Sequence, residues 1–126
     1  MKIANRNARP YVQRRQPFGG SNLYGRTFMS NPSSAAEGDS GYVVYSYGEH
    51  WPLFVAVSLG GRTVWFENKD RYGTTTSKHR SQCHPHCDTT MLTVDQMLLL
   101  IRKGFTALSR ERVAPIVQTE FHQEVA

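Results

Sequence analysis

The sequence is poor in cysteine and in long apolar runs, and each shortage excludes a class of protein. Only two cysteines occur in 126 residues, too few for a secreted scaffold held by disulfides. No apolar run approaches the roughly 20 residues that span a bilayer. The first ten residues, MKIANRNARP, lack the apolar core of a secretory signal. The length suits one domain. We therefore expect a small cytoplasmic protein with no membrane partner.

Acidic residues are absent from the first 30 positions, which carry six basic ones. The whole chain has 15 basic and 10 acidic residues, a net charge of +5, and eleven of the 15 are arginine. Guanidinium groups pair with phosphate in a bidentate geometry and stack on rings. The charge therefore favours nucleic acid or a nucleotide as partner. An acidic protein would be attracted by the same field, and a basic surface that only confers solubility is the plainer alternative.

Composition divides the chain at about residue 40. Residues 1–40 contain repeated Gly and Pro and the polar run Ser30–Gly41, so we expect a basic arm and loop there. Two extended pieces, Tyr11–Arg15 and Asn22–Met29, would join a sheet only as edge strands. Residues 41–126 are expected to form a single α+β domain.

A three-strand antiparallel meander is predicted over Tyr42–Asn68. YVVYSY and RTVWFE are rich in aromatic and β-branched residues. WPLFVAVSL between them has period two, which places Leu53, Val55, Val57 and Leu59 on one face. Gly48–His50 and Gly60-Gly61 supply the turns. Pro52 cannot donate a ladder hydrogen bond, so we expect it at a strand start or an edge.

One main helix is expected to begin after Thr93. Thr93 and Gln96 form a capping box, and Asp95 suits the positive end of the helix dipole. Gly104 is a candidate for the C-terminal cap. The preceding stretch, Lys69–Thr90, has no convincing period and reads as a long loop, which in a compact domain is usually functional or disordered. The expected fold is thus α+β, a small sheet with possible edge strands packed against one main helix.

Side chains suited to phosphate oxygens are dense in Thr74–Gln82. This is not a P-loop, because the motif's glycines are missing. Together with the basic clusters, we expect phosphate contacts from Arg14, Arg15, Arg26, Arg71, Thr75, Thr76, Ser77, Lys78 and Arg80. Stacking on bases is expected from Tyr24, Tyr47 and Tyr72. The alternative is a solvated loop whose hydroxyls cap its own turns.

Zinc is the one cofactor that the sequence suggests. Its candidate ligands are Cys83, His84, His86 and Cys87, although their spacing lacks the two clean pairs of a structural zinc site. Without zinc, no cofactor is expected.

Nothing in the sequence fixes a nucleophile, so we lean to a protein without catalytic residues. The alternative is a small nuclease or phosphotransfer enzyme that uses His50 and His79 as acid and base, with or without zinc.

Two segments resemble small uncharacterised bacteriophage and plasmid-borne proteins. They are YSYGEHWPLF, Tyr45–Phe54, and TTSKHRSQ, Thr75–Gln82, with WFENKDRY, Trp65–Tyr72, between them. The resemblance covers about a third of the chain. Because the group has no established activity, it implies a source and no catalytic residues.

Small phage proteins often modulate host machinery. The resemblance therefore implies an accessory protein that binds nucleic acid, a nucleotide or a host nucleic-acid-processing complex, in an anti-defence role such as CRISPR inhibition or nucleotide sequestration. A protein-interaction module for an acidic host protein is the remaining alternative. A homo-oligomer would suit an exposed edge strand.

Overall fold

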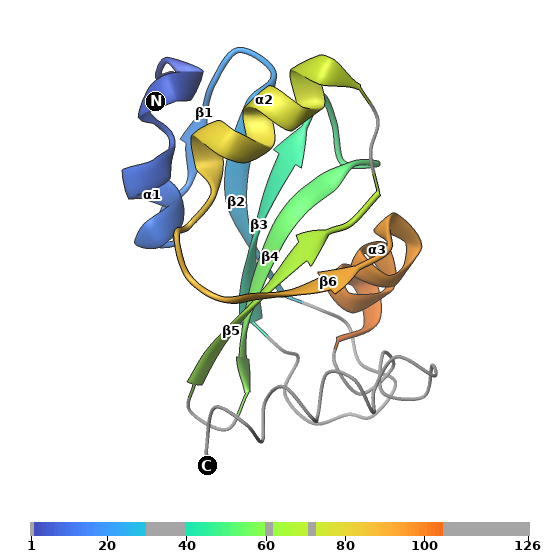
Figure 1. Cartoon of the computed structure of the whole chain (residues 1–126). Coiled ribbons are helices and arrows are strands. Elements are labelled where there is room, and N and C mark those ends of the chain that lie inside the picture. Colours follow the sequence, from blue (N-terminus) through green and yellow to red (C-terminus); the bar gives the residue numbers. More distant parts are fainter. Residues whose placement is uncertain (1, 30–39, 60–61, 71–72, 105–126) are drawn as a thin grey trace.

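The fold is built on one six-stranded sheet, in a computed structural model that describes residues 2–29, 40–59, 62–70 and 73–104 (Figure 1). The strands follow one another across the sheet in chain order: β1 (Phe18–Gly19), β2 (Leu23–Met29), β3 (Ser40–Ser46), β4 (Pro52–Leu59), β5 (Arg62–Asn68) and β6 (Thr89–Leu92). Neighbours are antiparallel except β5 and β6, which are parallel. The helices are a 3-10 turn η1 (Asn5–Asn7), α1 (Arg9–Gln13), α2 (Thr74–Cys83) and α3 (Val94–Lys103).

The α+β class is confirmed, but the predicted sheet is too small. The predicted meander is present as β3, β4 and β5, and β4 begins at Pro52 as expected. Leu59 pairs with Arg62, as a two-residue hairpin loop requires. The sheet continues beyond this meander through β2 and β1 on one side and β6 on the other.

Residues 2–29 contribute helices and strands to the fold. Asn22–Met29 is extended as predicted, but β2 lies between β1 and β3 and pairs with β3 over seven residues, so it is not an edge strand. The extended piece predicted at Tyr11–Arg15 is wrong. Pro10 lies in the first turn of α1, where its missing N–H costs nothing, and Val12 is fully buried beneath the helix. The predicted polar loop falls mostly on residues 30–39, outside the described residues.

Both faces of the sheet are covered, which explains the nearly continuous hydrophobic runs in β3 and β4. In Figure 1, α1 and α2 lie over one face and α3 over the other. The α1/α2 face buries Tyr42, Val44, Phe54, Ala56 and Trp65. The α3 face buries Val43, Tyr45, Val55, Val57 and Phe66 against Met97 and Leu100.

One irregularity breaks the predicted period of β4. Val44 pairs with Phe54 but Tyr45 pairs with Pro52, so Leu53 has no partner in the register. A bulge of this kind turns the extra side chain. Leu53 therefore joins the α1/α2 face, while Val55 and Val57 lie on the α3 face.

The segment predicted as a long loop contains α2. Its buried side chains are Thr76, His79 and Cys83, spaced three and four residues apart as one face of a helix requires. Because none of the three is a large aliphatic residue, a search for apolar periodicity does not find this helix.

The helix predicted after Thr93 is confirmed as α3. Gln96 N–H donates to Thr93 Oγ1 at 3.2 Å, and Thr93 N–H donates to Gln96 Oε1 at 2.8 Å. Gly104 ends the helix at φ 85°. No helix within the described residues has the length and apolar character needed to cross a membrane.

Candidate ligand-binding site

A cavity of about 340 Å³ lies between the β3–β4 turn and α2. Its lining residues are Ser46, Tyr47, His50, Trp51 and Thr76. Ser46 and Thr76 are buried, so their small hydroxyl side chains form the floor. Tyr47 is 50% exposed and His50 is exposed, and with Trp51 they give the cavity ring-bearing walls. Its volume falls within the roughly 300–1,000 Å³ of pockets that hold small molecules.

Tyr47 has a left-handed backbone, with φ 69°. This conformation is unusual for a bulky residue and costs on the order of 1–3 kcal/mol. Its backbone N–H donates to Asn22 O at 2.8 Å, and its ring lies against the His79 imidazole with centroids 5.5 Å apart. The turn is closed by Ser46 N–H to Trp51 O at 3.1 Å. Surrounding contacts thus hold a half-exposed tyrosine in a strained conformation, a feature that clusters at binding sites.

A chain of hydrogen bonds fixes His79 beneath Tyr47. Ser21 N–H donates to Asn5 Oδ1 at 2.8 Å, so the amide nitrogen of Asn5 faces His79 Nε2, at 3.4 Å. Nε2 is then an acceptor and the ring proton sits on Nδ1, which donates to Ser46 Oγ at 2.8 Å. Burial, with a smaller effect from the Lys78 charge, lowers the pKa of His79. His79 is therefore a neutral support for the floor of the cavity.

The exposed side of α2 carries a lysine and two hydroxyl side chains. Thr75, Ser77 and Lys78 are exposed, and the Lys78 charge acts on the neighbouring His79. Gly73 offers no side-chain cap, and the first turn of α2 contains no acidic residue. Of the predicted phosphate ligands, Thr75, Thr76, Ser77 and Lys78 thus lie on the helix that borders the cavity.

The predicted arginines are dispersed. Arg26 pairs with Val43 across the sheet and therefore lies on the α3 face, where it stacks over Tyr45 at 5.5 Å and forms an ion pair with Glu49. Tyr24 is on the same side, with its ring 5.4 Å from that of Tyr45.

Arg80 is held inside the protein and Arg14 and Arg15 lie at the far end of the α1/α2 face. Arg71 and Tyr72 lie outside the described residues. The structure therefore does not bring the described arginines together at one site.

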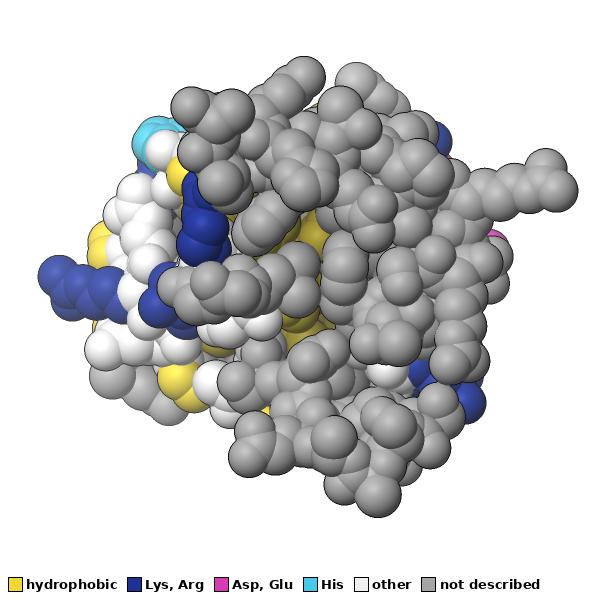
Figure 2. Space-filling model, turned by 90° about the horizontal axis from the view of Figure 1, so that it is seen from below, with side chains coloured by type: hydrophobic (Ala, Val, Ile, Leu, Met, Phe, Trp, Pro, Cys, Tyr) yellow, Lys and Arg dark blue, Asp and Glu magenta, His cyan; other side chains and the backbone are white. Residues whose placement is uncertain are grey.

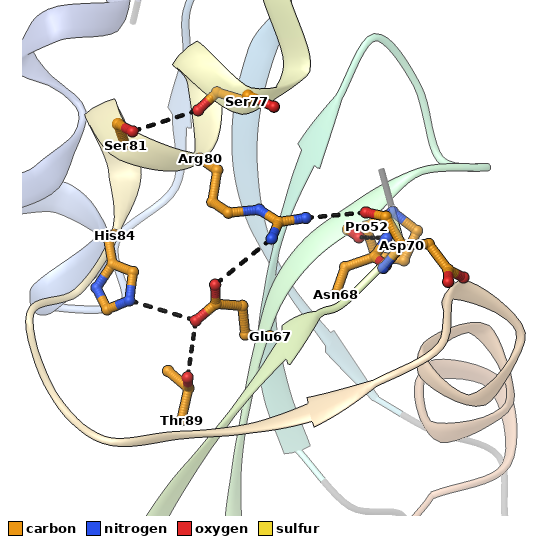
Figure 3. Close-up of polar contacts among 9 residues, drawn as sticks. All are labelled: Pro52, Glu67, Asn68, Asp70, Ser77, Arg80, Ser81, His84 and Thr89. Carbon is orange, nitrogen blue, oxygen red and sulfur yellow. Dashed lines mark hydrogen bonds and ion pairs between the residues drawn. The ribbon is translucent and has the colours of Figure 1, made fainter. Parts of the chain in front are cut away.

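Arg80 belongs to a polar network around the buried carboxylate of Glu67 (Figure 3). Thr89 Oγ1 donates to Glu67 Oε1 at 2.7 Å, and His84 Nε2 lies 3.3 Å from the same oxygen. Arg80 Nη1 is 3.7 Å from Glu67 Oε2, and its Nη2 donates to Asp70 O at 2.9 Å. The network joins β5, α2 and β6, so the role of Arg80 here is structural.

The candidate zinc ligands point to different places. Cys83 is buried in the core of the α1/α2 face, where burial raises the pKa of its thiol, whereas Cys87 is exposed. His84 contacts Glu67 through Nε2 and accepts from His86 N–H through Nδ1 at 2.9 Å. Across the described part of the chain, no three His, Cys, Asp or Glu residues are grouped to hold a metal. The zinc hypothesis gains no support from this geometry.

His50 and His79, the proposed acid and base of the enzyme alternative, both adjoin the cavity. His50 lines it, and His79 contacts Ser46 and Tyr47, which also line it. Sequence reasoning missed Asn5 and Ser46 as parts of this site. Asn5 lies 74 positions before His79, and no local pattern in the sequence links the two.

Comparison of the chain with protein-family models, curated proteins and solved structures found no match.

Proposed function

We propose that this protein binds a nucleotide, or an unpaired base of a nucleic acid, in the cavity beside Tyr47. The observation that carries the proposal is the Tyr47 ring itself, half-exposed on the cavity wall and held there by a strained backbone. Bases stack on aromatic side chains in single-strand and nucleotide sites. His50 and Trp51 supply further ring surface within the same cavity.

The helix that borders the cavity carries a positive charge suited to the phosphate of such a ligand. Lys78 is exposed on α2 beside the buried His79, and Thr75 and Ser77 offer hydroxyl donors on the same helix. The net charge of +5 adds a long-range attraction for anions. Binding that uses these groups should weaken as salt is raised, by close to one logarithmic unit per unit of log salt for each phosphate contact.

The enzyme alternative is less well supported. A general base needs a nitrogen free to take a proton, but both nitrogens of His79 already have partners, Asn5 and Ser46. Binding without turnover would suit a protein that sequesters its ligand, the anti-defence role that the phage resemblance implies. We therefore place the binding function first and the nuclease second.

The test compares ligand affinities of matched variants. Tyr47→Ala removes the ring and Tyr47→Phe keeps it, while Met91→Ala removes an equally exposed side chain from β6 as a surface control. Trp51 lies in the cavity, so its fluorescence reports binding of nucleoside monophosphates and short single strands. We expect Tyr47→Ala to weaken binding about tenfold or more, as loss of one base-stacking contact does, and the other two variants to bind like the wild type.

Equal affinity for Tyr47→Ala and the wild type would contradict the proposal. Cleavage of RNA or DNA that is lost in both His50→Ala and His79→Ala would favour the nuclease instead.

A further inference from the structure

A second hollow, of about 210 Å³, lies at the other end of the α1/α2 face. Arg14 and Arg15, which follow α1, line it together with side chains of β2 to β5 that include Thr27, Tyr42 and Thr63. Figure 2 views the molecule from below in the orientation of Figure 1, and at the left of this view Lys and Arg side chains lie beside hydrophobic ones. Arg14, Arg15, Thr27 and Thr63 are all exposed to solvent.

Arg15 occupies a backbone position that normally belongs to glycine. Gln16 N–H donates to Tyr11 O at 2.8 Å and Arg15 N–H donates to Val12 O at 3.0 Å, the pair of bonds of a Schellman motif. In this motif the first residue after the helix cap has a left-handed backbone, and that residue is Arg15, with φ 54°. Glycine would adopt this conformation without a steric penalty. Residues in strained backbone conformations cluster at functional sites, so the strain at Arg15 points to a function of its side chain.

The segment is also anchored to the sheet. The Tyr42 hydroxyl donates to Gln16 O at 2.7 Å, so the backbone next to Arg15 is tied to β3. Neither Arg14 nor Arg15 forms an ion pair with a carboxylate of the described residues, in contrast to Arg26 and Arg80. Two guanidinium groups thus stand over a hollow with hydroxyl side chains and without a described counter-ion.

We propose that this hollow is a phosphate-binding site, separate from the cavity beside Tyr47. Arg14 and Arg15 supply charge-assisted, bidentate hydrogen bonds to the phosphate oxygens. Thr27 on β2 and Thr63 on β5 line the hollow about three strand spacings apart, so a single phosphate takes a neutral hydroxyl donor from only one of them. The ligand is either a free phosphate or the phosphodiester of a nucleic acid, and both present the same oxygens to the site. The proposal does not depend on the function of the Tyr47 cavity.

The site is tested by NMR titration at constant ionic strength with two probes, inorganic phosphate and a dinucleoside monophosphate that carries only a phosphodiester. We expect saturable shifts in the Arg14 and Arg15 side chains and in the amide of Thr27 or of Thr63, whichever faces the bound phosphate. Arg15→Gly, which should fold at least as well as the wild type, should weaken binding about tenfold or more. Arg14→Gln should also weaken phosphate binding, and it leaves the left-handed position at Arg15 unchanged. Arg102→Gln, in the last turn of α3, removes the same charge elsewhere and should bind normally.

The two probes separate the two sources of phosphate. Binding of inorganic phosphate identifies a free-phosphate site, and binding of the dinucleoside alone identifies a backbone site. If neither probe gives saturable shifts, or if Arg102→Gln weakens binding as much as Arg15→Gly, the proposal is wrong. Tyr47→Ala should leave these shifts unchanged, so a failure at the Tyr47 cavity is distinguishable from a failure here.

Discussion

Ser46 Oγ accepts a hydrogen bond of 2.8 Å from His79 Nδ1, which ties the end of β3 to the middle of α2 beneath the cavity. Both side chains are buried, and the ring of Tyr47, the next residue after Ser46, lies against the same imidazole at a tilt of 37°. The position of the exposed ring therefore depends on a histidine that does not itself line the cavity. This relationship makes the support of the site testable through stability and pH.

The neutral state of His79 predicts a loss of stability in mild acid. Because burial lowers the pKa of His79 in the folded protein, the unfolded chain, with a pKa of about 6.5, takes up the proton first. The free energy of unfolding should fall as the pH drops below that value, and this loss should end once the pH is below the folded-state pKa. Urea denaturation across this pH range measures the effect. His79→Gln should flatten the dependence. An unchanged slope in that variant would show that another group is responsible.

Removal of the Ser46 hydroxyl should destabilise the fold. Ser46→Ala leaves the buried Nδ1–H of His79 without an acceptor, which costs about 1–3 kcal/mol. Ser58→Ala, at an exposed position of β4, is the matched control and should change stability by less than about 0.5 kcal/mol. Chemical denaturation compares the two. Equal stabilities would mean that the bond between Ser46 and His79 is not formed in solution.

Replacement of Glu67 should lower the stability of the protein, because Arg80, His84 and Thr89 all contact its carboxylate. Glu67→Ala leaves Arg80 and His84, neither of them more than 30% exposed, without their common carboxylate (Figure 3). Breaking a buried pair in this way costs about 3 kcal/mol. Glu67→Gln keeps an acceptor for Thr89 and should cost less. The ranking is measured by thermal unfolding, and it would be refuted if the two variants were equally stable.

Arg15→Gly should stabilise the protein by about 1 kcal/mol, because glycine has no side-chain penalty in the left-handed conformation. Gln13→Gly, at the last residue of α1, is the control and should destabilise by about 1 kcal/mol or more, because it lowers helix propensity and removes the hydrogen bond that Gln13 Nε2 donates to Pro85 O. A gain in stability combined with a loss of phosphate binding would show that Arg15 is retained for the ligand. A loss of stability in Arg15→Gly would remove the argument from strain.

The sequence allowed part of this fold to be predicted, where the physical signals are local. Alternating apolar residues and short turns define β3 to β5, and the Thr93–Gln96 capping box defines the start of α3. The rest depends on contacts between distant residues. α2 is anchored by buried polar side chains such as Thr76 and His79, which carry no apolar pattern. β6 pairs in parallel with β5 after a crossover through α2, and no turn motif in the sequence indicates this connection.

The candidate site shows the same division. The sequence predicts Tyr47 as a stacking residue, because it lies next to turn residues at the end of an aromatic strand. Asn5 and His79 meet where α2 packs beside η1, 74 positions apart in the chain, so their contact has no signal in the sequence. The sequence gives the number of arginines but not their positions in space, and the fold distributes them over both faces of the sheet.

The most direct test of the central proposal is an NMR titration of the wild-type protein with nucleoside monophosphates. If a base binds beside Tyr47, the largest saturable shifts should occur at Tyr47, His50 and the indole N–H of Trp51, and Lys78 should respond to the phosphate. Shifts that are absent, or that spread over basic residues without these rings, would contradict a base-binding cavity.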